Sequence, residues 1–308
     1  MNEEHLYDGH SGNHLSFQRI NKLGHEWIYV SASPHKGMVT SHDPATPFSI
    51  VHSPDCPCMM EGLSVKLFSQ NKKINQDDLQ LLRSLKPEYE ASFSGDEAED
   101  WGYIVARATG TNNDYPDINT YVAILSDKRV TVGALVGEHY KNPNVLLVTY
   151  CFIDRRFRRA GKGYAKRLVE TAVPEIRRLA QMPTDVANVF FEGENPDMMD
   201  LQSIAEAAFN PTFRLAWFRS LGAQRLEFDY RQPPLSANQQ PVKWLSMYCL
   251  GNSEVKKKTL KDFLTEFYRV LGKNVKGEEN EKEYQKCLEK QLRQIDSIPG
   301  DFVWTVTY

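Results

Sequence analysis

The stretch that decides the fold is TYCFIDRRFRRAGKGYAKRL, residues 149–168, in which an apolar run passes into a dense basic cluster. Seven of the fourteen residues from Arg155 to Leu168 are arginine or lysine, although the 308-residue chain has a net charge of −3. The apolar run is typical of a buried strand, and apolar residues recur at helical spacing after the cluster. The positive charge therefore falls where a strand passes, through Gly161 and Gly163, into a helix.

A strand, a glycine-containing turn and a helix N-terminus together favour phosphate binding. The first N–H groups of a helix lack partners, its dipole adds positive potential, and glycine lets the backbone approach oxygen atoms. Two common motifs do not fit, because Tyr164 stands where a Walker A loop needs Ser or Thr, and Lys166 where a dinucleotide loop needs Gly. A solvated helix face, a nuclear localisation signal and a nucleic-acid patch are less favoured, because none of them needs the glycines or the buried strand.

The remaining pattern is Arg158-x-x-Gly161-x-Gly163, preceded by the strand residue Ile153 and the aromatic Phe157. It resembles the pyrophosphate loop of the GNAT acetyltransferase superfamily, [RQ]-x-x-G-x-[GA], which lies between the fourth strand and the following helix. The resemblance covers roughly residues 63–250.

A second similarity lies in NPTFRLAWFRSLGAQRLEFDYRQPPL, residues 210–235, where Gly222 fixes the alignment with the superfamily's second half. Two residues depart from that pattern. Phe218 occupies the usual tyrosine position, and Ala223 replaces the usual aromatic residue.

The resemblance implies acetyl-CoA, or another acyl-CoA, as the cofactor. Its pyrophosphate is expected on the backbone of residues 158–164, and its pantetheine arm beside the fourth strand. The residues expected to bind it are Phe152, Ile153, Arg155, Arg158, Arg159, Ala160, Gly161, Lys162, Gly163 and Tyr164.

Acyl transfer to an amine needs a base for the ammonium and an acid for the departing thiolate. Glu192 and Glu194 end the fifth predicted strand, where the superfamily often keeps a carboxylate, and alternation places both on one face. One is expected to act as the base while the other holds the substrate. Because Phe218 has no hydroxyl, Tyr230 is the candidate acid, with water as the alternative. The competing interpretation makes both carboxylates surface charges and Tyr230 a core residue.

The predicted fold class is α/β (α+β), a GNAT-type acyl-CoA transferase fold with a mixed, largely antiparallel sheet of seven strands flanked by helices. Residues 1–62 are expected to form an irregular N-terminal extension with two strand-like pieces, 15–20 and 26–32. Residues 63–252 are expected to form the GNAT-like N-acetyltransferase domain. Residues 253–308 form a helical C-terminal extension that ends in a strand, which extends the sheet.

Composition narrows the class of protein. Basic and acidic residues number 37 and 40, which disfavours a dedicated nucleic-acid partner, and no apolar run is long enough to cross a membrane. With no signal peptide visible and five cysteines that suggest no disulfide framework, a cytoplasmic protein is expected. His42, His52, Cys56 and Cys58 invite a zinc interpretation, but Cys-x-Cys is tighter than the usual spacing, so no metal is predicted.

The predicted function is that of an N-acetyltransferase moving the acetyl group of acetyl-CoA to a small-molecule or peptide amine by direct attack in a ternary complex. The alternatives are a non-catalytic CoA-binding sensor or scaffold, and a transferase for longer acyl chains or for a peptide or protein amine. The sequence leaves a homodimer open.

Overall fold

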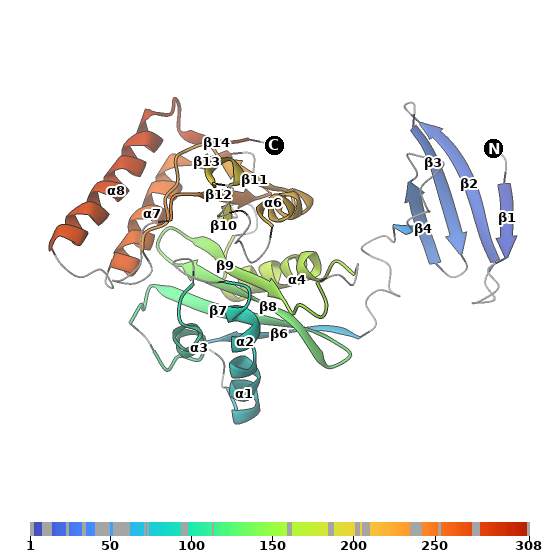
Figure 1. Cartoon of the computed structure of the whole chain (residues 1–308), viewed down its shortest axis with the longest axis horizontal. Helices are drawn as coiled ribbons and strands as arrows, with labels where there is room; N and C mark the ends of the chain where they lie inside the picture. The colour runs from blue at the N-terminus through green and yellow to red at the C-terminus, as the bar shows by residue number, and fades with distance from the viewer. Residues whose placement is uncertain are drawn as a thin grey trace. The chain divides into compact units, whose positions relative to one another are not determined.

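The computed structural model divides the chain into two compact units, Met1–Leu63 and Ser64–Tyr308 (Figure 1). The structure describes residues 3–7, 14–22, 25–32, 35–40, 50–51, 62–70, 72, 74–93, 98–112, 114–158, 162–183, 188–200, 204, 210–234, 242–251, 254–272 and 278–306. The cysteine and histidine residues weighed as zinc ligands, His42, His52, Cys56 and Cys58, lie outside this part of the chain.

The N-terminal unit contains a five-stranded antiparallel sheet whose strands follow chain order. Both strand-like pieces expected from the sequence are present, since residues 15–20 lie in β2 and residues 26–32 in β3. The three other strands were not expected, because they are short or rich in polar residues. The strands are β1 (Glu3–Tyr7), β2 (His14–Lys22), β3 (His25–Ala32), β4 (His35–Thr40) and β5 (Ile50–Val51).

The second unit is built on a nine-stranded sheet in the order β13-β14-β11-β12-β10-β9-β8-β7-β6. Of the pairings whose register is described, only β9–β10 is parallel. The bounds are β6 (Leu63–Ser69), β7 (Ile118–Asp127), β8 (Val130–Tyr140), β9 (Val145–Ile153), β10 (Asn188–Glu194), β11 (Ala223–Leu226), β12 (Leu245–Leu250), β13 (Glu254–Lys256) and β14 (Phe302–Val306). The predicted fold class, a mixed and largely antiparallel sheet with flanking helices, is confirmed.

The end of the chain does extend the sheet. Strand β14 pairs antiparallel with β11 and with β13. The sequence predicted seven strands and this eighth one, but it did not predict β13, which has only three residues. The strand that follows α6 (Pro211–Ser220) is short, because β11 ends at Leu226.

Helices cover both faces of the sheet. An ideal Cβ added to Gly137 of β8 would lie 3.3 Å from Cδ1 of Ile176 in α4. Tyr140 lies on the other face of β8, and its ring lies 5.2 Å from that of Phe263 in α7. Helices α4 and α7 therefore lie on opposite faces of the sheet. The helices are α1 (Gln76–Ser84), α2 (Lys86–Glu90), α3 (Trp101–Ala108), α4 (Tyr164–Leu179), α6 (Pro211–Ser220), α7 (Lys257–Gly272) and α8 (Glu278–Ser297), with a 3-10 turn at Pro196–Met198.

The C-terminal helices share one hydrophobic core with the sheet. Phe263 of α7 is fully buried and its ring lies 5.3 Å from that of Phe190 in β10. Tyr284 of α8 packs against α7 and donates a hydrogen bond to the carbonyl oxygen of Tyr268 at 2.6 Å. The stripes of apolar residues predicted in this part of the sequence therefore pack on the sheet and on each other.

Three helices, α1, α2 and α3, precede β7. Trp101 of α3 is almost fully buried, and its indole nitrogen donates to the carbonyl oxygen of Leu82 in α1 at 2.9 Å. Tyr89 of α2 lies beside Trp101, with the two rings tilted, and makes edge-to-face contacts with Tyr150 and Phe152 of β9. This aromatic cluster joins the segment between β6 and β7 to the centre of the sheet.

Among the described helices, none is both long enough and apolar enough to cross a bilayer.

Replacing Phe263 tests whether α7 belongs to the core. We expect Phe263→Ala to lower the free energy of unfolding by about 3–5 kcal/mol, because it leaves a cavity between α7 and the sheet. Phe213→Ala on α6, where the ring is 67 % exposed, is the control and should change it by less than about 0.5 kcal/mol. Urea denaturation followed by circular dichroism measures both, and equal effects would contradict this packing.

Candidate active site

The parallel strands β9 and β10 are paired over only part of their length. Their register runs from Val145 opposite Asn188 to Val148 opposite Phe191, and β9 then continues without a described pair from β10. At the same place Thr149 is an extra residue in β9, because Tyr150 and Val148 pair with consecutive residues of β8. Such a bulge bends its strand and increases the local twist. The sheet therefore opens between β9 and β10.

A cavity of about 460 Å³ lies where the two strands separate. Its walls come from β9, from β10, from the loop before α4 and the first turn of α4, and from α6. The described lining residues are Ser92, Phe93, Val148, Thr149, Cys151, Phe152, Ile153, Phe157, Arg158, Lys162, Gly163, Tyr164, Ala165, Lys166, Phe191, Glu192, Arg214, Trp217, Phe218 and Ser220.

The N-terminus of α4 opens into this cavity. Gly163 caps the helix in the left-handed conformation, with φ of 60°, which glycine adopts without the cost that a side chain imposes. No side chain caps α4, and the first N–H groups of a helix have no acceptor within it. Tyr164, Ala165 and Lys166, which carry these groups, all line the cavity. The positive end of the helix dipole is therefore directed at the cavity.

The predicted cofactor residues fall into three sets. Phe152, Ile153, Arg158, Lys162, Gly163 and Tyr164 line the cavity. Arg155 is not among its described lining residues and instead forms an ion pair with Glu88 of α2, with 3.4 Å between Nε and Oε1. The third set, Arg159, Ala160 and Gly161, lies outside the described residues.

Two of the basic side chains are held in place by specific partners. Arg158 donates from Nε to the carbonyl oxygen of Ile153 and from Nη2 to the Ser92 hydroxyl, each at 2.7 Å. Lys162 lies 3.1 Å from Oδ2 of Asp127, which also accepts a hydrogen bond from the Tyr164 hydroxyl. The hydrogen bonds from Tyr164 and Lys162 lower the pKa of Asp127. These contacts hold the side chains of Arg158 and Lys162, which lie on the two described sides of the segment that leads into α4.

Glu192 lies at the edge of the cavity and is bound to Tyr230. The Tyr230 hydroxyl donates to Oε1 of Glu192, and the tyrosine is only 2 % exposed. Burial, followed by the charge of Glu192, raises the pKa of Tyr230 well above its ordinary value. The phenol therefore keeps its proton, and it lies outside the described lining of the cavity.

Glu194 has a different environment from Glu192. It is buried, and its Oε2 lies 3.0 Å from Nη1 of Arg214 in α6. Glu194 is absent from the described lining of the cavity, whereas Arg214 is part of it. The structure therefore brings Glu192 and Tyr230 together and places Glu194 with Arg214.

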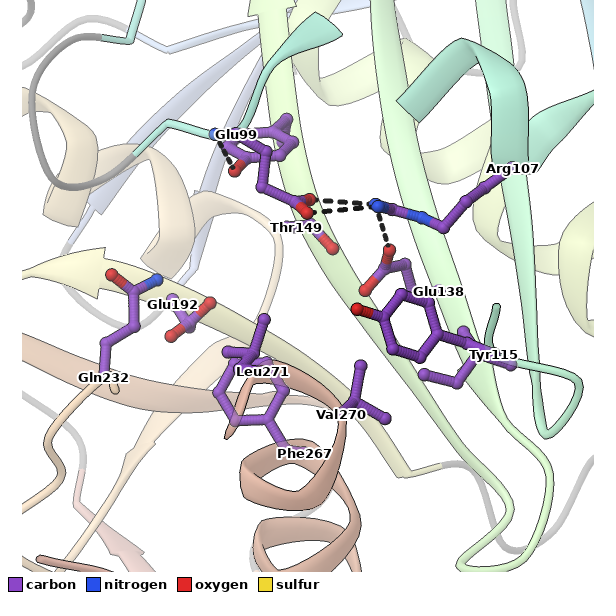
Figure 2. Close-up of a pocket in the computed structure, with 12 residues that line it drawn as sticks. Glu99, Arg107, Tyr115, Glu138, Thr149, Glu192, Gln232, Phe267, Val270 and Leu271 are labelled. Atoms are coloured by element: carbon purple, nitrogen blue, oxygen red, sulfur yellow. Dashed lines mark hydrogen bonds and ion pairs between the residues drawn. The ribbon is translucent and has the colours of Figure 1, made fainter. Parts of the chain in front are cut away.

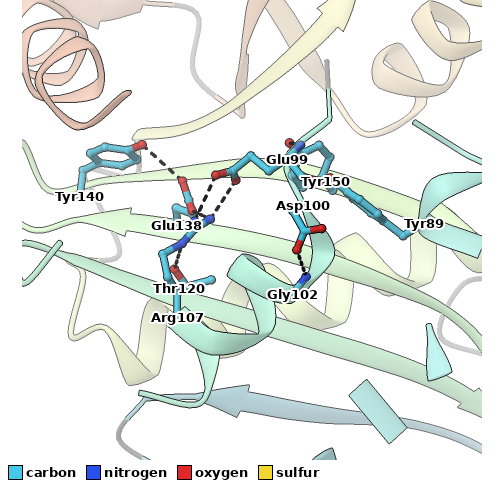
Figure 3. A network of polar contacts seen from close by, with 9 residues as sticks. All are labelled: Tyr89, Glu99, Asp100, Gly102, Arg107, Thr120, Glu138, Tyr140 and Tyr150. Atoms are coloured by element: carbon cyan, nitrogen blue, oxygen red, sulfur yellow. Dashed lines mark hydrogen bonds and ion pairs between the residues drawn. The ribbon is translucent and has the colours of Figure 1, made fainter. Parts of the chain in front are cut away.

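A second, smaller cavity of about 20 Å³ lies beside Glu192 (Figure 2). Its polar side contains Arg107 of α3, which is bound by Glu99 through two hydrogen bonds, at 3.1 and 2.8 Å, and by Glu138 of β8 at 2.8 Å (Figure 3). Its apolar side comes from α7. Thr149 and Glu192 line both cavities, so the two meet where the sheet opens.

Sequence reasoning missed several residues of this second cavity. Arg107 stands in the otherwise apolar helix WGYIVARA, and Glu138 in the long strand VTVGALVGEHY. A charge within an apolar run is a signal of a buried ion pair, since such charges are rarely buried without partners. Nothing comparable identifies Thr149 or Gln232, because neither a bulge nor an isolated bridge has a mark in the sequence.

One part of the cavity corresponds to what the resemblance to the GNAT superfamily implies. The segment between β9, the fourth strand of the second unit, and α4 lines the cavity, and this is where the resemblance places the pyrophosphate loop. The prediction of a GNAT-type fold is confirmed.

Solved structures similar to this chain include proteins assigned to that family. One from Bacteroides thetaiotaomicron is 16% identical with a TM-score of 0.46, over 68% of this chain and 99% of its own. One from Desulfovibrio desulfuricans is 12% identical with a TM-score of 0.39, over 61% and 98%. A streptothricin acetyltransferase assigned in Bacillus anthracis, in complex with acetyl coenzyme A, is 14% identical with a TM-score of 0.28, over 76% and 83%.

No protein-family model and no curated protein matches the sequence.

Cys151 lines the larger cavity, and the reactivity of its thiol tests whether its pKa is raised. Burial raises the pKa of Cys151 to about 12, so at pH 8 about one thiol in 10⁴ is ionised. We expect iodoacetamide to leave Cys151 unmodified in the folded protein at pH 8 and to modify it after denaturation, as measured by peptide mass spectrometry. Rapid modification of the folded protein would show that the side chain is not buried in this way.

Proposed function

We propose that this chain is an acyl-CoA-dependent N-acyltransferase that transfers an acetyl group from acetyl-CoA to an amine. The observation that carries the proposal is the cavity between β9 and β10, which is lined by the first turn of α4 and by Glu192. A phosphate-binding end and a carboxylate are the two features that such a transfer requires of one cavity.

The cofactor's pyrophosphate fits the turn at the start of α4. Free backbone N–H groups of the first helical turn would donate to its oxygens, and Gly163 places no side chain in the way. The side chains of Arg158, Lys162 and Lys166 line the same region and would offset its charge.

The pantetheine arm fits the part of β9 that has lost β10 as a neighbour. From Thr149 to Ile153, β9 has β8 on one side and the cavity on the other. An extended ligand would pair there as an added strand. A backbone N–H in this segment would donate to the thioester carbonyl and stabilise the negative charge that develops on its oxygen.

Glu192 is the candidate base. It would take a proton from the ammonium form of the acceptor, and the neutral amine would then attack the thioester carbon. As the nitrogen–carbon bond forms, the carbon–sulfur bond breaks, and the second proton lost by the nitrogen would pass to the thiolate through water. Tyr230 would hold Glu192 in position, since its hydroxyl is bound to Glu192 and lies away from the larger cavity.

The competing function is a non-catalytic CoA-binding sensor or scaffold. One observation favours it: Phe218, which lines the cavity, provides no hydroxyl for the leaving thiolate. A transferase for longer acyl chains or for a peptide amine would differ from the proposed enzyme only in the acyl group or the amine that the cavity accepts. Release of free thiol from acetyl-CoA in the presence of a panel of amines distinguishes an enzyme from a sensor.

Charge reversal in the first turn of α4 tests the cofactor site. We expect Lys166→Glu to raise the dissociation constant for CoA about tenfold, because a carboxylate beside the helix N-terminus repels the pyrophosphate. Lys258→Glu is a matched control, since both lysines lie in the first turn of a helix and form i,i+4 ion pairs. Isothermal titration calorimetry measures both variants, and equal losses would argue against this placement of the pyrophosphate.

Replacing Glu192 tests the base. We expect Glu192→Gln to lower kcat/KM for acetyl transfer by about 10²-fold or more while CoA affinity stays unchanged, because an amide cannot accept the ammonium proton. Glu254→Gln, an exposed change in β13, should leave both quantities unchanged. Thiol release followed with a chromogenic disulfide gives the rates. Full activity of the Glu192 variant would remove the carboxylate from the mechanism.

A further inference from the structure

The smaller cavity is placed to receive the acceptor. It touches the larger cavity through Thr149 and Glu192, at the point where the sheet opens. Its other walls come from α3, β8 and α7, which lie away from the first turn of α4. A group in this cavity would therefore reach the proposed thioester position beside the candidate base, from the side opposite the pyrophosphate.

The lining of this cavity carries an excess of negative charge. Three carboxylates, Glu99, Glu138 and Glu192, line it together with one guanidinium, that of Arg107. Every nitrogen of Arg107 already has a described partner: both Nη atoms bind carboxylates, and Nε lies 3.4 Å from the Thr120 hydroxyl. Arg107 thus neutralises part of the cluster, and four of its five N–H groups are already taken, so a carboxylate on a ligand would have to share this cation with Glu99 and Glu138.

The charge of Glu138 does not alter this conclusion. Burial raises the pKa of Glu138, against the opposing effect of Arg107. If Glu138 holds a proton, the two remaining carboxylates still outnumber the one guanidinium. The cavity favours a cation in either state.

Two hydrogen-bond acceptors in the lining, unpaired in the part of the chain that the structure describes, indicate the kind of ligand that suits the cavity. Gln232 is 5 % exposed, lines the cavity, and its Oε1 has no hydrogen-bond partner within the described residues (Figure 2). The buried hydroxyl oxygen of Thr149, in the same lining, also has no partner among them. Buried polar atoms are rarely left unpaired, because the loss of their hydrogen bonds to water is unfavourable unless another partner replaces them. Both atoms can accept a hydrogen bond, so a ligand with N–H donors fits them.

The size of the cavity and its apolar wall restrict the ligand further. About 20 Å³ is slightly more than the roughly 10–15 Å³ needed to hold one water molecule, and a primary ammonium group is of similar size. Phe267, Val270 and Leu271 of α7 form the apolar wall, and these side chains would have to move outward to admit a short methylene chain beside the ammonium group. The C-terminal helix thereby limits what can enter.

We propose that this cavity is the acceptor subsite and that it takes a small, unbranched primary amine without a carboxylate, bound as its ammonium ion by Glu192, Gln232 and Thr149. This inference rests on the proposed N-acyltransferase function and names the class of amine. The ammonium proton passes to Glu192 before the nitrogen attacks, and the C–S bond of acetyl-CoA breaks as the new C–N bond forms. The products are an N-alkylacetamide and free CoA.

The test compares amines that differ only in a carboxylate. With the full chain and acetyl-CoA, kcat/KM is measured for ethylamine against glycine, propylamine against β-alanine, and butylamine against 4-aminobutanoate. We expect each alkylamine to be preferred at least about tenfold, because the lining repels a carboxylate and offers it no free cation. Equal or reversed preferences would overturn the proposal.

Two variants separate a binding role from a structural one. Gln232→Leu, close in size, should raise the KM for propylamine about tenfold and leave the KM for acetyl-CoA unchanged. Gln80→Leu on the exposed side of α1 is the control and should change neither. Leu271→Ala should shift the preferred amine to a longer chain. An unchanged KM in Gln232→Leu would mean that the cavity holds a trapped water only, and would overturn the proposal.

Separate measurements of propylammonium binding and CoA binding distinguish a wrong acceptor subsite from a wrong transferase function. Saturation-transfer NMR detects propylammonium on the full chain without any acyl-CoA, and calorimetry detects CoA on its own. If CoA binds and peptide amines are acetylated while propylammonium neither binds nor reacts, the acceptor subsite is wrong and the transferase function stands. If CoA does not bind while propylammonium binds in a Gln232-dependent way, the cation site stands and the transferase function fails.

Discussion

The rest of the structure depends on the point at which β9 and β10 stop pairing. Two parallel strands that stayed hydrogen-bonded along their whole length would leave no room between them. The extra residue at Thr149 bends β9 just where its pairing with β10 ends at Val148. The larger cavity, the exposed edge of β9 and the meeting point with the smaller cavity all follow from this single irregularity.

The two cavities that meet at this opening carry charges of opposite sign. On one side, the N-terminus of α4 and the lysines beside it make the larger cavity positive. On the other, Glu99, Glu138 and Glu192 make the smaller cavity negative. An anionic cofactor and a cationic acceptor would thus be drawn to different sides of one site, and Tyr230 fixes the carboxylate that stands between them.

The chain outside the predicted GNAT-like domain contributes to the site rather than only surrounding it. Helix α7 provides the apolar wall of the smaller cavity, and Phe263 ties the same helix to the sheet. The sequence predicted α7 from its apolar stripe but gave no face for it to pack against. The charges of Arg107 and Glu138 within apolar runs could have indicated a buried ion pair, but nothing in the sequence indicated that Glu99, Glu138 and Glu192 would line one cavity.

Local rules determined the strands, the main helices and the glycine-containing turn at the start of α4, because alternation, helical spacing and the positive φ of Gly163 are properties of neighbouring residues. Together with the resemblance to the GNAT superfamily, those rules predicted the fold class and offered Glu192 as the candidate base. Tertiary structure alone decided that Tyr230 is hydrogen-bonded to Glu192. It also decided that Arg155 forms an ion pair with Glu88, and that Gln232 and Thr149 line the same cavity. These contacts join segments far apart in the chain, and no local pattern specifies which distant side chain completes a buried hydrogen bond or charge pair.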